Sequence, residues 1–270
     1  MKEKSQLEKS GKCIWVTGAS SGMGKALALR LAKEGNYVIA SGRRKNNLEA
    51  LSVTAGGRLV PLVFDVNTNT DGLREVKKQL SEITDYLDIV ICCAGICEYE
   101  DDLSFDPAMY ERVFGVNFLG VIRTLHIAMP FLRASKLRPH IVTIGSLSST
   151  APFPRAEAYG ASKAALEYFM KALRADTVHL PLDTTLVRPG FVATELTAEN
   201  DFSMPFMMSA EQAADRILDG IKNKKRVVDF PRRLSWPLRL MGTLSPLWFR
   251  WVAPRVTRQR KSSWAKSLSR

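Results

Sequence analysis

Short apolar runs recur along the whole chain, and helical patterns separate them from one another. Short apolar runs that alternate with helices are typical of a parallel sheet covered on both faces by crossover helices. We therefore expect an α/β fold with a doubly wound parallel sheet of about seven strands. The runs are rich in residues that favour strands, and they cover 12–17, 36–41, 58–66, 87–93, 139–145, 183–188 and 226–230.

The chain is long enough, and apolar enough, to form one sizeable domain. It has 270 residues, of which 46% are hydrophobic, and α/β folds of this length often form a single domain. We expect that domain at 12–231, after a polar tail at 1–11 and before an extension at 232–270. Within it, Asp106-Pro107 would start a long helix, because proline is well tolerated at the first helical position.

A glycine-rich turn follows the first predicted strand and leads into a helical pattern. Gly18 would permit the tight turn, while Gly22 and Gly24 would let backbone approach a pyrophosphate and let the helix pack closely. The N-terminus of the helix would offer free N–H groups to phosphate. The spacing is not the usual Gly-x-Gly-x-x-Gly, and a surface turn is the alternative. The Rossmann-type dinucleotide site expected here comprises Gly18, Ser20, Ser21, Gly22, Met23 and Gly24.

The end of the second predicted strand indicates which dinucleotide binds. An acidic residue there would bond the ribose 2′-hydroxyl of NAD, but Gly42 stands in that place and Arg43 follows it. A guanidinium suits the 2′-phosphate of NADP through charge-assisted hydrogen bonds. We therefore expect Arg43 to favour NADP(H), and a solvated basic loop is the alternative.

A serine, a tyrosine and a lysine carry the chemistry that the sequence indicates. Tyr159 and Lys163 lie four residues apart, so they would share one face of a helix. Ser146 ends the fifth apolar run, and open α/β sheets bind ligands at such strand ends. A nearby ammonium favours the phenolate, so we expect Lys163 to lower the pKa of Tyr159. Taken alone, the Tyr-x-x-x-Lys spacing also fits an exposed helix pair.

Together these motifs resemble the classical short-chain dehydrogenase/reductase (SDR) family over about 12–231. Asn117 matches the family's catalytic asparagine, and Ser146, Tyr159 and Lys163 match its other catalytic residues. The resemblance implies an NADP(H)-dependent carbonyl reductase or alcohol dehydrogenase. It also implies cofactor contacts from Asp65, Val66, Ala94, Gly95, Tyr159, Lys163, Pro189, Gly190, Val192 and Thr194.

The resemblance also implies a mechanism. Tyr159 would protonate the carbonyl oxygen while NADPH delivers hydride, and Ser146 would orient the carbonyl. Lys163 would lower the tyrosine pKa and bond the nicotinamide ribose, and Asn117 would hold a water that connects Lys163 to solvent. One departure is Cys92-Cys93, where the family usually carries two asparagines that help to stabilise the sheet. We expect a modest local change there and no loss of catalysis.

The segment 195–208 would cover the substrate, as the resemblance implies. Its apolar residues would form an adaptable lid, and an apolar carbonyl such as a long-chain ketone is the expected substrate. The alternative is that these residues pack on the core beneath a loop. The expected substrate contacts are Ser146, Phe153, Tyr159, Met204 and Phe206.

The four cysteines predict reduced thiols and no metal site. Their spacing matches no zinc pattern, and three lie in or just before predicted buried strands, as in a cytoplasmic protein. A redox-sensitive Cys97 is the alternative. The polar N-terminal tail shows no apolar region of a secretory signal.

The positive charge is concentrated at the C-terminal end. The net charge is +12, yet 221–270 hold fourteen Lys/Arg and one acid, whereas 1–220 carry 25 basic and 26 acidic residues. The extension also holds four of the five tryptophans. This mixture indicates that 232–270 contacts an anionic membrane surface peripherally. Packing on the protein or on a second subunit is the alternative, and no nucleic-acid partner is expected.

The sequence of the extension does not predict a membrane-spanning helix. Its apolar stretch between Arg239 and Arg250 falls far short of the ~20 residues that a span needs. Prolines also interrupt the helical pattern, namely Pro231, Pro237, Pro246 and Pro254.

Two other functions fit the sequence. One is a catalytically silent NADP-binding sensor, and the other is a membrane-attached interaction protein whose basic tail is the working part. The complete catalytic set argues against a sensor, because cofactor binding alone does not need the hydroxyls of Ser146 and Tyr159. Dimers and tetramers are common in the family, so a homo-oligomer is the expected alternative to a monomer.

Overall fold

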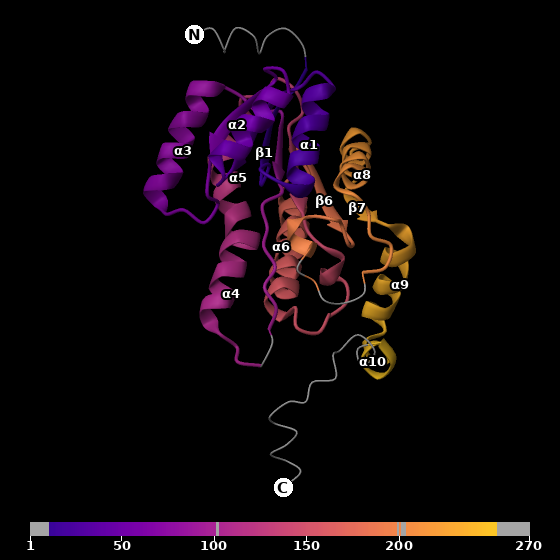
Figure 1. Cartoon of the computed structure of the whole chain (residues 1–270). Helices are drawn as coiled ribbons and strands as arrows, with labels where there is room; N and C mark the ends of the chain where they lie inside the picture. The colour runs from indigo at the N-terminus through magenta and orange to yellow at the C-terminus, as the bar shows by residue number, and fades with distance from the viewer. Residues whose placement is uncertain (1–10, 101–102, 199, 201–203, 253–270) are drawn as a thin grey trace.

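The computed structural model describes residues 11–100, 103–198, 200 and 204–252, and its centre is a parallel sheet (Figure 1). The strand order β3-β2-β1-β4-β5-β6-β7 shows that the chain starts inside the sheet and winds outward in both directions. This doubly wound sheet confirms the predicted fold class. Its strands are β1 (Cys13–Thr17), β2 (Tyr37–Gly42), β3 (Leu59–Val63), β4 (Ile89–Cys92), β5 (His140–Ile144), β6 (Asp183–Pro189) and β7 (Val227–Phe230).

Alternate side chains of each strand enter two separate apolar cores. On β1, Ile14 and Val16 belong to the first core, whereas Cys13 and Trp15 belong to the second. They alternate because successive residues of a strand point to opposite faces. Both faces are covered, which is why the strands read as continuous apolar runs.

Helices cover both faces of the sheet and leave its carboxyl edge to loops. The helices that bury side chains in the first core are α1 (Gly22–Lys33), α2 (Lys45–Thr54) and α8 (Ala210–Lys222). Those on the second core are α3 (Thr70–Ile83), α5 (Gly120–Arg133) and α6 (Glu157–Asp176). The α4 helix (Pro107–Phe114) packs on α6, and η2 (Leu147–Ser149) and α7 (Glu195–Ala198) are short turns in loops.

The π turn η1 (Gly115–Leu119) joins α4 and α5 into one helical stretch, Pro107–Arg133. The stretch starts as predicted, with the Asp106 side chain accepting a hydrogen bond from the Ala108 nitrogen at 3.0 Å. Among the described residues, only this stretch is long and apolar enough to cross a membrane, and half of its most apolar window is buried in the protein. A buried core helix meets the same criterion.

The C-terminal extension packs on the loop that follows β5. Leu238 and Trp248 form a buried cluster with Leu147 and Ala151, and Trp248 Nε1 donates to the Pro152 carbonyl oxygen at 2.9 Å. One side of the extension therefore lies on the protein, as the alternative expectation had it. Figure 1 shows its elements on the side of the molecule away from α3: α9 (Arg232–Thr243), α10 (Ser245–Leu247) and η3 (Trp248–Val252).

The α9 helix runs through Pro237, so the expectation that this proline interrupts the helical pattern was wrong. Proline cannot donate to the carbonyl one turn earlier, which here belongs to Arg233. Arg233 and Pro237 are both exposed. Water can therefore bond that carbonyl, and the helix continues.

Candidate active site

Distant segments of the chain bring the predicted catalytic residues to the carboxyl edge of the sheet. Ser146 follows β5, Tyr159 and Lys163 lie on α6, and Asn117 lies on the π turn η1. The Ser146 hydroxyl lies close enough to the Tyr159 phenol to lower its pKa. Lys163 Nζ donates to the Ile144 carbonyl oxygen at 2.9 Å, which ties α6 to the end of β5.

Asn117 fastens the loop after β4 to α6. Its side-chain amide accepts from the Ile96 nitrogen (2.9 Å) and donates to the Ile96 oxygen (2.9 Å) and to Ser162 Oγ (3.0 Å). The amide is fully buried, and π turns often occur at functional sites. A Cβ on Gly95 would come within 3.3 Å of Asn117 Oδ1 and 3.5 Å of Lys163 Nζ. The backbone at Gly95 therefore approaches both predicted catalytic side chains.

Burial controls the protonation of Tyr159 and Lys163. It raises the pKa of Tyr159 to about 12, helped by nearby Cys97, and the nearby Ser146 hydroxyl offsets only part of this rise. Burial likewise lowers the pKa of Lys163 to about 8. The net shift of the Tyr159 pKa is therefore upward, not downward as expected. The ammonium lies 5.7 Å from the ring centre, but the loss of hydration outweighs its attraction.

The glycine-rich turn has the shape of a phosphate cradle. Gly18 and Gly22 have positive φ angles of 70° and 52°, which other residues rarely adopt. A Cβ on Gly18 would lie 2.6 Å from the Ala94 nitrogen, and one on Gly22 would lie 3.0 Å from Thr194 Cγ2. Ser21 places no side-chain cap on α1, and no acidic residue lies in the first turn. Backbone N–H groups are thus available there, and the turn fits a dinucleotide diphosphate.

The remaining turn residues hold the turn in place. Met23 packs against the first core, and Gly24 lies so close to the Gly18 carbonyl that a side chain would not fit. At the end of β2, a Cβ on Gly42 would come within 3.0 Å of Ser20 Oγ. A side chain at position 42 would therefore press on Ser20, which would have to move by a few tenths of an ångström.

Two arginines follow β2, and they differ in their partners. Arg44 Nη1 lies 2.9 Å from Glu195 Oε2, and its hydrogen bond holds the pKa of Glu195 below the ordinary value. This pair joins the β2 loop to the start of 195–208. Arg43 is exposed, and no described residue forms a salt bridge with it. Its guanidinium is therefore available at the place where a 2′-phosphate is expected.

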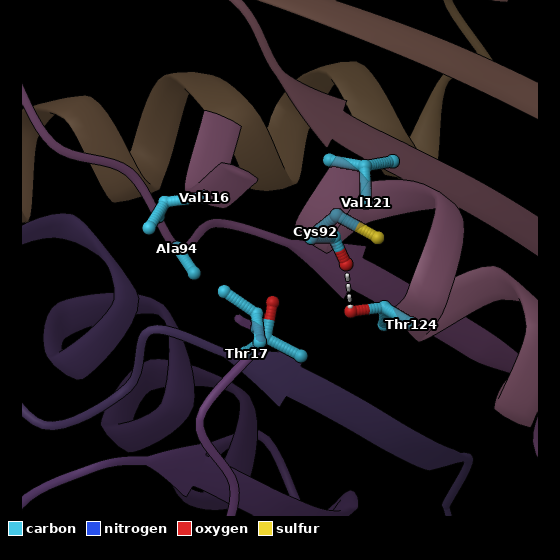
Figure 2. A pocket seen from close by; sticks show the side chains of 8 residues that line it. Thr17, Cys92, Ala94, Val116, Val121 and Thr124 are labelled. Atoms are coloured by element: carbon cyan, nitrogen blue, oxygen red, sulfur yellow. Dashed lines mark hydrogen bonds between the residues drawn. The ribbon is translucent and has the colours of Figure 1, made fainter. Parts of the chain in front are cut away.

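Figure 2 shows a small pocket behind the site, to which Thr17 and Cys92 contribute side chains. The pocket is too small to hold a water molecule. At its edge, the Thr124 hydroxyl donates to the Gly120 carbonyl oxygen at 2.7 Å. Cys92 is buried, and burial raises the pKa of its thiol. A neutral thiol suits this apolar space, so Cys92 needs none of the hydrogen bonds that an asparagine would make.

The other predicted cofactor residues lie along the same edge of the sheet. Val66 is buried and lines the pocket of Figure 2, whereas Asp65 beside it is exposed. After β6, the Gly190 nitrogen donates to the Phe230 carbonyl oxygen at 2.7 Å. Val192 then pairs with Met208 through a parallel bridge, which brings the end of 195–208 onto the segment that is expected to hold the nicotinamide.

The described part of 195–208 reaches toward the site through a polar relay. Tyr99 donates from its hydroxyl to Asn200 Oδ1 at 2.8 Å, and Asn200 Nδ2 donates to the Met204 sulfur at 3.3 Å. Phe206 is half exposed. Residues 199 and 201–203 lie outside the described part of the chain, so the lid role of Met204 and Phe206 stays a prediction.

Sequence reasoning missed Tyr99 and named Cys97 only as a redox-sensitive alternative, and both residues lie near Tyr159. Burial raises the pKa of Tyr99, and both Cys97 and Tyr159 add to the rise. Burial also raises the pKa of Cys97 to about 11, so its thiol stays protonated at neutral pH, which argues against a redox-sensitive cysteine. Their position just after β4 was the available signal, because ligands bind beyond the carboxyl ends of such strands.

Phe153 lies in a cleft of about 420 Å³ between the β5 loop, α6 and the extension. Its ring meets the Trp248 ring edge-on, with centroids 5.6 Å apart, and Phe249 lines the same cleft. Neither Ser146 nor Tyr159 lines it. The substrate role of Phe153 therefore stays a prediction.

The fold and the site are typical of a dinucleotide-dependent oxidoreductase, and comparison with known proteins gives the family. The sequence model of the short chain dehydrogenase family matches residues 12–203. This match covers most of the chain, so the protein belongs to the short-chain dehydrogenase/reductase family.

Relatives and solved structures agree with this assignment. An uncharacterised oxidoreductase of Myxococcus xanthus is 37% identical over 243 residues, which are 88% of this chain and 94% of the relative. The 11-beta-hydroxysteroid dehydrogenase-like 3 of Arabidopsis thaliana is 31% identical over 250 residues, covering 87% of this chain and 78% of that protein. The structure of a Burkholderia phymatum short chain dehydrogenase/reductase with NAD has a TM-score of 0.78 at 21% identity, covering 89% and 96% of the two chains.

Proposed function

We propose that this protein reduces a carbonyl group to an alcohol, or catalyses the reverse oxidation, with Tyr159 as the proton donor or acceptor. The observation that carries the proposal is the convergence of three side chains: the Ser146 hydroxyl lies near the Tyr159 phenol, and Lys163 on the same helix as Tyr159 bonds the Ile144 carbonyl oxygen at the end of β5. A sensor that only binds cofactor would not need this pair of hydroxyls. The catalytically silent alternative is therefore the weaker one.

The residues of the chain supply the proton side of the reaction, and a bound nicotinamide would supply the hydride. With its pKa raised to about 12, Tyr159 is protonated at neutral pH and can donate to a carbonyl oxygen. The Ser146 hydroxyl can bond the same oxygen and stabilise the charge that develops there. Lys163, whose pKa of about 8 leaves it mostly charged at neutral pH, attracts the phenolate that forms.

NADP(H) is the cofactor we propose. Gly18, Gly22 and the start of α1 would hold the diphosphate, and Lys163 would reach the nicotinamide ribose. Arg43 supports a 2′-phosphate because it is exposed and the described residues leave its charge unpaired, whereas Gly42 provides no carboxylate for a ribose 2′-hydroxyl. The NAD complex of the Burkholderia protein shows the fold and does not decide between the two cofactors.

The substrate we propose is an apolar carbonyl compound. Met204 is half-buried, and the relay through Asn200 links it to Tyr99, which lies near Tyr159. A polarizable methionine that is linked in this way to a half-buried tyrosine would provide an adaptable apolar wall. The name of the Arabidopsis relative, 11-beta-hydroxysteroid dehydrogenase-like 3, supports an apolar substrate, because a steroid is apolar.

We also propose that the extension holds the enzyme peripherally at an anionic membrane facing the cytoplasm. Trp236 and Leu240 on α9 and Leu244 at its C-cap follow one another at intervals of four and are 74%, 62% and 42% exposed. They form a stripe on the side of α9 away from buried Leu238. The extension also carries exposed Leu247, Trp251, Arg232, Arg233 and Arg250, the residue types that favour a membrane interface.

NADPH oxidation by the purified protein tests the reductase proposal. Decanal represents an apolar carbonyl, glyceraldehyde a small polar one, and NADH replaces NADPH in a parallel series. We expect faster turnover with decanal and with NADPH. Arg43→Ala should lower the preference for NADPH over NADH by at least tenfold, about the value of one charge-assisted contact, while Arg44→Ala serves as the matched control. An Arg43→Ala protein with the wild-type preference would refute the cofactor assignment.

A further inference from the structure

A chain of buried polar groups runs behind the catalytic serine. The Ser149 hydroxyl lies 2.8 Å from the Ser146 carbonyl oxygen and 2.7 Å from Glu167 Oε2. The Ser146 hydroxyl accepts from the Ser148 nitrogen at 3.1 Å. Ser149 therefore connects the turn that orients the Ser146 hydroxyl to a carboxylate on α6.

The carboxylate belongs to the same helix face as the other catalytic candidates. Tyr159, Lys163 and Glu167 follow at intervals of four on α6, so they line one side of it. Burial opposes ionisation of Glu167, but hydrogen bonds from Ser149 and Lys171 and the charge of Arg188 hold its pKa below the ordinary value. Glu167 is thus an anion at neutral pH, and its bond to Ser149 is charge-assisted.

A buried arginine fixes the position of Glu167. Arg188, on β6, donates to Glu167 Oε1 at 3.1 Å and to both carboxylate oxygens of Asp229, on β7, at 2.7 and 2.8 Å. The side chains of the three residues are only 7%, 12% and 12% exposed. A buried and fully paired cluster of this kind has one defined geometry, because a broken pair would leave an uncompensated charge.

The cluster also reaches the C-terminal extension. Arg239 of α9 lies 3.3 Å from Asp229 Oδ2. The extension also contacts the loop that follows β5. There, a Cβ on Gly242 would overlap the Thr150 carbonyl oxygen. The loop that carries Ser146 is therefore held between an internal ion cluster and the extension.

We propose that Glu167 is a positioning residue for the predicted catalytic Ser146, and that it acts through Ser149. This inference rests on the proposed function. Glu167 and Tyr159 share α6, so the link Glu167–Ser149–Ser146 sets the distance of the serine hydroxyl from the helix that carries the phenol. Small displacements of reacting groups cause large losses of rate, up to about a hundredfold for 1 Å.

The test compares Ser149→Ala, Glu167→Gln and the double variant with the wild type. We expect each single variant to lower kcat about tenfold while the KM for NADPH changes less than about twofold. The double variant should be no slower than the slower single variant, because both break one link. Lys171→Ala removes an exposed partner of Glu167 and is the matched control, and Ser149→Thr should restore activity.

Hydrogen exchange provides a readout that needs no turnover. The amides of Ser148, Ser149 and Thr150 close the turn after Ser146, and we expect them to exchange faster in Ser149→Ala and Glu167→Gln but not in Lys171→Ala. Ser149→Ala leaves the ion cluster intact, so it tests the link even if Glu167→Gln does not fold. Wild-type exchange together with Tyr159-dependent turnover at the wild-type kcat would overturn the inference and leave the proposed function standing.

Discussion

At the scale of single residues, burial decides how the candidate site handles protons. The same desolvation raises the pKa of the Tyr159 phenol and lowers that of the Lys163 ammonium. Both groups are thereby pushed toward their neutral forms. A neutral phenol is the form that can donate a proton to a carbonyl oxygen, and a charged Lys163 is the form that stabilises the phenolate left behind.

The rate of carbonyl reduction should therefore depend on the charge of Lys163. Lys163 is protonated below its pKa of about 8 and neutral above it, while Tyr159 stays protonated until about 12. We expect kcat/KM for reduction to be constant below pH 8 and to fall about tenfold per pH unit above it, as for a single titrating group. A pH–rate profile with NADPH and decanal measures this. A rate that stays level to about pH 10 would contradict the role of Lys163.

Residue spacing alone predicted the Tyr159–Lys163 pair but not the direction of the tyrosine pKa. The spacing shows that the two side chains share a helix face, whereas the pKa depends on how much protein covers them. The proximity of Cys97 and Tyr99 to Tyr159 escaped notice for a related reason. They follow β4 in an irregular segment, where no periodicity shows which side chains turn toward Tyr159.

At the scale of elements, the two sides of the C-terminal extension differ in burial. Leu238 and Trp248 bury themselves against the β5 loop, whereas Trp236 and Leu240 face outward. The sequence left membrane contact and packing on the protein as alternatives, and the structure places apolar residues on both sides of α9. Charge and composition could not separate the two sides, because that requires knowing which way the helix docks.

Point substitutions on the outer face test membrane contact better than removal of the extension. Removal would uncover Leu147 and Ala151, which pack against Leu238 and Trp248 of the extension. It would therefore destabilise the loop that carries Ser146. We expect Trp236→Ala combined with Leu240→Ala to weaken co-sedimentation with anionic vesicles at least tenfold, since two exposed apolar side chains are lost. Val53, which is 84% exposed on α2, provides the control variant Val53→Ala. Equal binding by the double variant, or binding indifferent to anionic lipid, would refute the membrane proposal.

At the scale of the whole molecule, the sheet could be predicted because its strands carry their own signal. Each observed strand lies within a predicted apolar run or within one residue of it, since both faces are buried and no polar alternation obscures the pattern. The Glu167–Arg188–Asp229 cluster could not be predicted in this way. Its members come from α6, β6 and β7, and only the sheet order brings them together behind Ser146.

The most direct test of the account follows the hydride itself. Wild-type protein and Tyr159→Phe are each incubated with decanal and NADPH deuterated at the transferable position of the nicotinamide, and deuterium in the alcohol product is measured by mass spectrometry. We predict deuterated alcohol from the wild type and a loss of at least about a thousandfold in Tyr159→Phe, in line with the removal of a general acid, with NADPH binding retained. Deuterium transfer at the wild-type rate by Tyr159→Phe would contradict the central claim that Tyr159 is the proton donor.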